Sequence, residues 1–228
     1  MIMNRWEMWR LYHFTLCPFS RKVRFALAVK GVTHELSVER PWEKRAQFTA
    51  LNPAGQTPVM QRDKVVLCDS VAIVEHFEER LERTPLLGAT PEDRAETRRL
   101  MAWFDQKFYA EVGAPLLAER MYKRAVLRAA PDGGMIRQAG RMADGHLDYI
   151  DYMLERRAWL GGGQFGLADI TAAAHLSVAD YLSGLEWDGH EPAKTWYSAI
   201  KSRPTFRPLL AERLEGLAPP AHYDKLDF

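Results

Sequence analysis

The sequence predicts a chain of two parts, an α/β domain followed by an all-helical domain. In the first 85 residues, short alternating apolar runs are interleaved with segments of helical spacing. Beyond the turn TPLLG, at residues 84–88, no strand candidate of any strength occurs, and helix-start signals recur instead. Such a change of class marks a domain boundary, and 228 residues are enough to bury two small cores.

The first part is expected to follow the order βαβαββα. Alternating apolar residues indicate strands, spacing of four indicates helices, and glycine, proline and charged turns separate them. The expected elements are a strand at 9–14, a helix at 20–30 stopped by Gly31, a strand at 33–38, a short helix within 41–48, a hairpin of 59–60 with 65–68, and a helix from Ser70.

The second part is expected to be helical throughout. Thr90 and Pro91 supply a capping residue and a proline at the first helical position, which opens a long helix. Gly113 and Pro115 should kink or break that helix. The domains are therefore expected at residues 1–84 and 90–215, followed by a tail at 216–228, and the remaining helices at 135–157, 167–182 and 192–200.

Composition excludes several classes of function. Lys and Arg number 31 against 30 Asp and Glu, so no global field favours nucleic acid. Two cysteines are too few for a disulfide framework and fit a reducing, cytoplasmic compartment. No run of about 20 apolar residues predicts a membrane span, and MIMNRWEMWR carries charges too early for a signal peptide. The scattered histidines show no metal-ligand spacing, so no metal site is expected.

The stretch TLCPFSRK, residues 15–22, places a thiol where chemistry could use it. Cys17 comes just before the first turn of a helix, where free backbone N–H groups and the helix dipole stabilise a thiolate. Pro18 follows it, and the cations Arg21, Lys22 and Arg24 are close in sequence. The alternative is that Cys17 is a small apolar filler in a turn.

Three stretches in the order LYHFTLCPFSRKVRFAL, LNPAGQTPVM and CDSVAIVEHFEE resemble the glutathione transferase superfamily. The resemblance implies a thioredoxin-like domain joined to an all-helical one, a homodimer, and glutathione as cofactor. It implies that Cys17 faces the glutathione sulfur, as in the omega-type, thiol-transferring branch. Ser20 is the second catalytic candidate, because its hydroxyl could donate to a thiolate, although it could equally cap the helix.

The same resemblance implies a glutathione-binding surface. Pro58 is expected in the cis form, so that Val59 offers its backbone N–H and C=O to the cysteinyl part; otherwise Pro58 merely starts a strand. Ser70 and the helix N-terminus would bind the γ-glutamyl carboxylate, and Asp69, one methylene shorter than the usual Glu or Gln, would face the γ-glutamyl ammonium. The alternative is that Ser70 and Asp69 serve only as helix caps. The implied glutathione-binding residues are Gln56, Thr57, Pro58, Val59, Asp69 and Ser70.

A family helix cap, usually Ser or Thr followed three residues later by Asp, is only half present. Here it reads Gly166-Leu-Ala-Asp169, so the side chain at the first position is missing. Glycine at an N-cap costs only a few tenths of a kcal/mol against Ser or Thr. The helix should therefore form, with Asp169 reaching back to the cap.

A narrower resemblance concerns a branch of transferase-like proteins that bind filaments of the bacterial division GTPase FtsZ. RPWEKR, RRLMAWFDQKFYAEV, HLDYIDYMLERRAWL and the ending PPAHYDKLDF carry it. It implies an adaptor at the division site, with glutathione-dependent thiol transfer by Cys17 as the alternative function. The basic residues could also be a solvated helix face, and the tail could dock on a dimer partner. The implied partner-binding residues are Trp42, Lys44, Arg45, Lys123, Arg124, Tyr223, Leu226 and Phe228.

Overall fold

The computed structural model describes residues 8–226. The chain divides into two compact units, Met1–Pro85 and Leu86–Phe228, and residues 216–226 of the predicted tail belong to the second. The predicted fold class is confirmed: a thioredoxin-like α/β unit is followed by a helical unit. Each unit is built around its own buried core.

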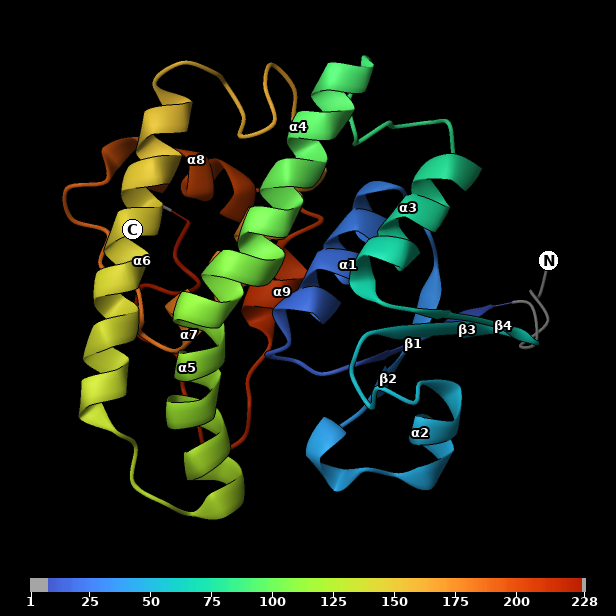
Figure 1. Cartoon of the computed structure of the whole chain (residues 1–228), viewed down its shortest axis with the longest axis horizontal. Helices are drawn as coiled ribbons and strands as arrows, with labels where there is room; N and C mark the ends of the chain where they lie inside the picture. Colours follow the sequence, from blue (N-terminus) through green and yellow to red (C-terminus); the bar gives the residue numbers. More distant parts are fainter. Residues whose placement is uncertain (1–7, 227–228) are drawn as a thin grey trace. The chain divides into compact units, whose positions relative to one another are not determined.

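A four-stranded mixed sheet organises the first unit (Figure 1). The strand order is β2-β1-β3-β4, with β1 parallel to β2 and with β3 antiparallel to both β1 and β4. A parallel pair needs a crossover, which the helix between β1 and β2 supplies. The strands are β1 (Trp9–His13), β2 (His34–Val38), β3 (Val59–Arg62) and β4 (Val65–Cys68).

Helices cover the two faces of this sheet. The two longer helices pack against one another on one face, and the short α2 lies on the other (Figure 1). Gly31, at a φ of +66°, lies just beyond the first helix, where the sequence predicted its end. Buried Lys30 pairs with Glu78 at 2.7 Å and so links the two longer helices. The helices are α1 (Pro18–Val29), η1 (Pro41–Glu43), α2 (Ala46–Leu51) and α3 (Ser70–Arg80).

The second unit is helical, apart from two isolated bridges, across its described residues. Its centre is α7, every residue of which is buried, and α4 and η2 pack against it. The helices are α4 (Pro91–Ala102), η2 (Trp103–Gly113), α5 (Ala114–Leu116), η3 (Leu117–Leu127), α6 (Gly133–Leu154), α7 (Leu167–Tyr181), α8 (Glu191–Lys201) and α9 (Arg207–Ala211).

Gly113 and Pro115 do not break the long helix, although a break was one of the two outcomes that the sequence predicted. Helical structure continues from Pro91 to Leu127, with right-handed helical backbone at each junction. The hydrogen bonding changes instead, because η2 and η3 are π-helical on either side of the short α5. The wider π-helical bonding accommodates the glycine and the proline without a break.

The structure explains the glycine at the start of α7. A Cβ on Gly166 would lie 2.5 Å from the carbonyl oxygen of Leu86, which itself accepts the N–H of Leu167 at 2.8 Å. Serine or threonine therefore has no room at this cap. Asp169 reaches back as predicted and accepts the N–H of Gly166 at 3.0 Å. It also accepts the Leu160 N–H and the Trp196 Nε1–H, each at 2.9 Å.

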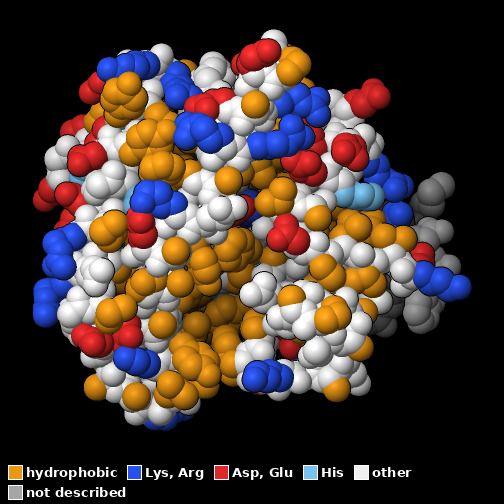
Figure 2. Space-filling model, viewed as in Figure 1, with side chains coloured by type: hydrophobic (Ala, Val, Ile, Leu, Met, Phe, Trp, Pro, Cys, Tyr) orange, Lys and Arg blue, Asp and Glu red, His pale blue; other side chains and the backbone are white. Residues whose placement is uncertain are grey.

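Charge on the surface is mixed. Basic and acidic side chains are interspersed over the face that Figure 2 shows, as the formal net charge of +1 leads one to expect. Recognition of a charged partner therefore depends on local groups of like charge that lack an opposite neighbour.

Candidate functional site

Cys17 is the N-cap of α1, and its thiol sits among backbone groups. The Sγ atom accepts the N–H of Ser20 at 3.4 Å and lies 3.5 Å from the carbonyl oxygen of Thr57, to which a protonated thiol donates. The side chain is partly exposed and makes no disulfide. The predicted thiol at a helix start is thus present, and in this position it caps the helix.

The neighbours of the thiol differ from the expectation in two respects. The contact from Ser20 comes from its backbone N–H, while its hydroxyl oxygen accepts the N–H of Phe14 at 3.5 Å. The Ser20 hydroxyl is thus placed at the turn of Phe14, and its role beside a glutathione thiolate stays a prediction. The cations of α1 are buried, and the Arg21 Nε–H donates to the Thr15 carbonyl at 2.9 Å.

The loop before β3 contains the cis bond that the family pattern implied, but Thr57 rather than Val59 lies beside the thiol. The Thr57–Pro58 peptide bond is cis. Val59 lies inside β3, opposite both Tyr12 and Cys68, so its backbone groups face a neighbouring strand. Val59 is therefore the wrong candidate for pairing with a peptide. Thr57 precedes the strand, and its carbonyl faces the thiol.

Gln56, on the outer side of this loop, is exposed, while its backbone carbonyl accepts the Asn52 side-chain amide at 2.8 Å. The amide of Asn52 thereby fixes the loop. The Gln56 side chain is open to solvent, and its role at glutathione stays a prediction.

Asp69 and Ser70 begin α3, and the structure favours the capping alternative for Asp69. Its Oδ1 accepts the N–H of Val71 at 2.7 Å and of Ala72 at 3.3 Å. Asp69 holds a φ of +75°, which is costly for a residue other than glycine. Ser70 is buried at the first position of the helix. Its role at a glutathione carboxylate stays a prediction.

The predicted partner patch of the first unit is smaller than the sequence indicates. The Trp42 ring packs edge-on against Phe14, with ring centroids 5.0 Å apart, and is half-buried rather than exposed. Arg45 pairs with buried Glu39 through both its Nε and its Nη2. Lys44 is exposed and has no ion-pair partner within residues 8–226. Its charge is therefore the uncompensated one of the set.

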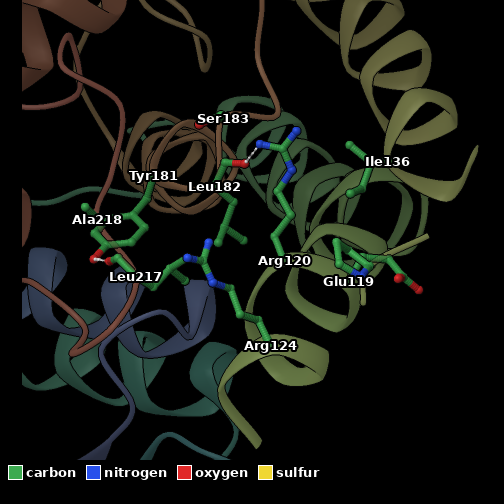
Figure 3. A pocket seen from close by; sticks show the side chains of 10 residues that line it. Glu119, Arg120, Arg124, Ile136, Tyr181, Leu182, Ser183, Leu217 and Ala218 are labelled. Carbon is green, nitrogen blue, oxygen red and sulfur yellow. Dashed lines mark hydrogen bonds between the residues drawn. The ribbon is translucent and has the colours of Figure 1, made fainter. Parts of the chain in front are cut away.

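In the second unit, the two predicted basic residues of η3 also differ from one another. Lys123 pairs with buried Glu119 at 2.7 Å. Arg124 is exposed and makes no ion pair or hydrogen bond with any described residue. It lines a cavity of about 310 Å³, together with Arg120, Ile136, Leu182 and Leu217 (Figure 3). Of the ten residues that line the cavity, only Arg124 was predicted from the sequence as a binding residue.

The tail docks on its own chain, which corrects the role proposed for Tyr223. The Tyr223 side chain is fully buried, with its ring edge-on to Tyr181 at 5.1 Å. The Tyr181 hydroxyl donates to the Leu217 carbonyl at 2.6 Å. Tyr223 is therefore not a surface for another protein in this conformation. Leu226 is half-buried, and Phe228 lies outside the described residues.

A polar cluster also holds the tail. His222 Nε2 lies 2.9 Å from Asp180 Oδ1, which also accepts the Trp187 Nε1–H at 3.1 Å. The hydrogen bond to Asp180 raises the pKa of His222 above its ordinary value, against partial burial, which lowers it. Lys201 donates to the backbone carbonyl of His222 at 3.3 Å. The tail is thus attached to both α7 and α8.

One histidine lies among carboxylates, a grouping that the sequence did not indicate. His190 is within 3.7 Å of three aspartates on one face of α6: Asp144, Asp148 and Asp151. Burial lowers the pKa of His190, but its hydrogen bonds to Asp151 and Asp144 outweigh that effect and raise it. Asp151 also accepts the Ala193 N–H at 2.7 Å. A protonated His190 therefore ties α6 to the start of α8.

Known proteins resemble this chain over most of its length. The family profile described as Glutathione S-transferase, N-terminal domain matches residues 11–85. FtsZ-localized protein A of Caulobacter vibrioides (strain NA1000 / CB15N) is 49% identical over 222 residues, covering 96% of this chain and 97% of that protein. The chain belongs to the glutathione S-transferase superfamily.

Solved structures agree. The structure described as FzlA from C. crescentus superposes with a TM-score of 0.93 at 48% identity, covering 97% of this chain and 100% of that one. A structure described as a glutathione S-transferase from Rhodospirillum rubrum F11 gives a TM-score of 0.94 at 46% identity, with the same coverage. Among the described residues, no helix is both long and apolar enough to cross a membrane.

Proposed function

We propose that this protein binds FtsZ filaments and acts at the site of cell division, in the cytoplasm. The observation that carries the proposal is 49% identity to FtsZ-localized protein A along nearly the whole of both chains. Half of the residues being shared over both units supports a shared surface as well as a shared fold. The exposed cations Lys44 and Arg124 supply positive charge without a compensating carboxylate, which an acidic filament would complement.

Co-sedimentation tests this proposal. Purified FtsZ is polymerised with GTP, and the protein is added before centrifugation. The protein should pellet with filaments and stay in the supernatant when GTP or FtsZ is omitted. Equal recovery of the protein in the supernatant with and without filaments would show that it does not bind FtsZ.

The thiol supports a second candidate function, glutathione-dependent thiol transfer by a homodimer. The partly exposed Cys17 sits at a helix N-terminus and faces the backbone of Thr57, beside the cis peptide bond of Pro58. A thiol at a helix N-terminus is suited to forming a mixed disulfide with glutathione. Gln56 and Ser70 remain candidates for contacting the expected ligand, Ser70 at its γ-glutamyl carboxylate.

Calorimetry with reduced glutathione tests the second function before any substrate is chosen. Binding at micromolar to low millimolar concentration that weakens in a Ser70→Ala variant would support it. Glutathionylation by glutathione disulfide, followed by mass spectrometry, should be lost in Cys17→Ser and kept in Cys68→Ser. Wild-type protein that neither binds glutathione nor is modified at Cys17 would leave filament binding as the sole function.

A further inference from the structure

A cavity in the second unit combines an apolar wall with positive charge. It lies between η3, the start of α6, the end of α7 and residues Leu217 and Ala218, and its volume is about 310 Å³ (Figure 3). Ile136, Leu182 and Leu217 provide apolar surface. Tyr181 contributes its ring, while its hydroxyl is committed to the Leu217 carbonyl.

Two guanidinium groups on this wall lack a carboxylate. Arg120 and Arg124 are one helical turn apart on η3. The Arg120 Nη1–H donates to the Leu182 carbonyl at 2.6 Å, and neither arginine forms an ion pair within residues 8–226. A guanidinium presents its donors as a planar fork that matches a carboxylate.

The acidic residue of the lining does not neutralise this charge. Glu119 pairs with Lys123 at 2.7 Å and accepts the Asp132 backbone N–H at 2.7 Å. Figure 3 shows its carboxylate directed away from both arginines. The cavity is therefore suited to an anion attached to an apolar group.

The size and surroundings of the cavity indicate a protein segment. At about 30 Å³ per water, its volume equals about ten water molecules, enough for one acidic side chain and one aliphatic neighbour. Two exposed apolar side chains are close in sequence to the lining: Leu127, three residues after Arg124, is 55% exposed, and Met135, next to Ile136, is 42% exposed. An extended partner would cover these side chains, whereas a small acid would leave them in water.

We propose that this cavity anchors a segment of FtsZ in which an Asp or Glu lies next to an aliphatic residue. The carboxylate pairs with Arg124 and Arg120, and the aliphatic side chain packs on Leu182 and Ile136. The inference rests on the proposed filament binding and adds its point of contact. An arginine that becomes desolvated at the centre of an interface is a frequent source of binding energy.

The test is Arg124→Gln in the co-sedimentation assay. Arg124 is exposed and unpaired, so its substitution should leave folding unchanged, which the urea midpoint checks. We expect filament affinity to fall about 10- to 30-fold. Arg137→Gln is the matched control, because Arg137 is an exposed cation of the same unit that does not line the cavity. It should bind within twofold of wild type.

Two further variants separate charge from shape. Arg124→Lys keeps the positive charge but loses the planar fork of donors. We expect its filament affinity to lie between that of wild type and that of Arg124→Gln. Ile136→Glu places a carboxylate on the wall and should weaken binding as much as Arg124→Gln does. If wild type pellets and Arg124→Gln pellets equally, the anchor is overturned while filament binding stands. If wild type does not pellet, the filament function and the anchor both fail.

Discussion

Replacing Tyr223 by alanine should destabilise the helical unit although the residue lies only five positions before Phe228. Its side chain is fully buried, and its ring packs edge-on against Tyr181 at 5.1 Å with the ring planes at 81°. Aromatic-to-alanine substitutions in cores cost about 3–5 kcal/mol. The tail can detach instead of leaving a cavity, which limits the cost to the free energy of docking.

That free energy of docking can be worked from the contacts. Burial of the Tyr223 ring contributes about 2–3 kcal/mol, and the hydrogen bond from Lys201 to the His222 carbonyl about 1 kcal/mol. The exposed pair Arg213–Asp224 adds about 0–1 kcal/mol. These contributions total about 3–5 kcal/mol, and we expect Tyr223→Ala to lower the free energy of unfolding by that amount.

Urea unfolding followed by tryptophan fluorescence measures the loss, since Trp187 and Trp196 are buried in the same unit. The midpoint should fall with little change in the slope. The control is Leu226→Ala, a half-buried position of the same tail, which should cost less than about 1 kcal/mol. A loss below about 1 kcal/mol for Tyr223→Ala, or equal losses for the two variants, would refute the docked tail.

Three other predictions concern the same unit. Asp169→Asn should cost about 2–4 kcal/mol in urea unfolding, because an amide cannot accept all three of the N–H groups that the carboxylate accepts; a cost under 1 kcal/mol would contradict this. Gly166→Ala should cost at least about 2 kcal/mol, since the added Cβ would lie 2.5 Å from the Leu86 carbonyl oxygen, whereas Gly163→Ala, with open space around its Cβ, should cost under 1 kcal/mol. Asp180 raises the pKa of His222 in the folded protein, so the His222–Asp180 pair stabilises the docked tail. That stabilisation is full below the unfolded pKa of about 6.5 and is lost as the pH rises through the folded pKa. Tail amides should therefore exchange hydrogen faster, relative to their intrinsic rates, at pH 8 than at pH 6, and His222→Gln should remove the difference.

Local patterns predicted the fold and the start of the thiol site. Alternation and spacing located the strands and the two longer helices of the first unit to within about two residues, because propensity, capping and burial agree there. The short helix predicted within 41–48 is instead η1 at 41–43 and α2 at 46–51. Cys17 at the start of α1 followed from its position before Pro18. The cis peptide bond at Pro58 followed from the resemblance to the family and from no local pattern.

The features that sequence reasoning missed depend on residues far apart in the chain. Arg120 and Arg124 are an i, i+4 pair that could have been noticed, but their cavity needs Leu182 and Leu217. The docking of Tyr223 depends on Tyr181, 42 positions earlier. At Gly166, the sequence showed only that a side chain was missing, and the position of the Leu86 carbonyl supplies the reason.

Preservation of a thiol motif does not by itself indicate an enzyme, because its residues here serve the fold. Cys17 caps α1 through its Sγ atom, Asp69 caps α3 through two N–H groups, and the Ser20 hydroxyl holds the turn at Phe14. Each would be retained in a protein that never binds glutathione, since losing a cap costs about 1 kcal/mol. An adaptor therefore has a physical reason to keep most of the CPFS and DS motifs. Features that folding does not explain are therefore better evidence of function, and the unpaired Arg124 beside an apolar cavity is such a feature.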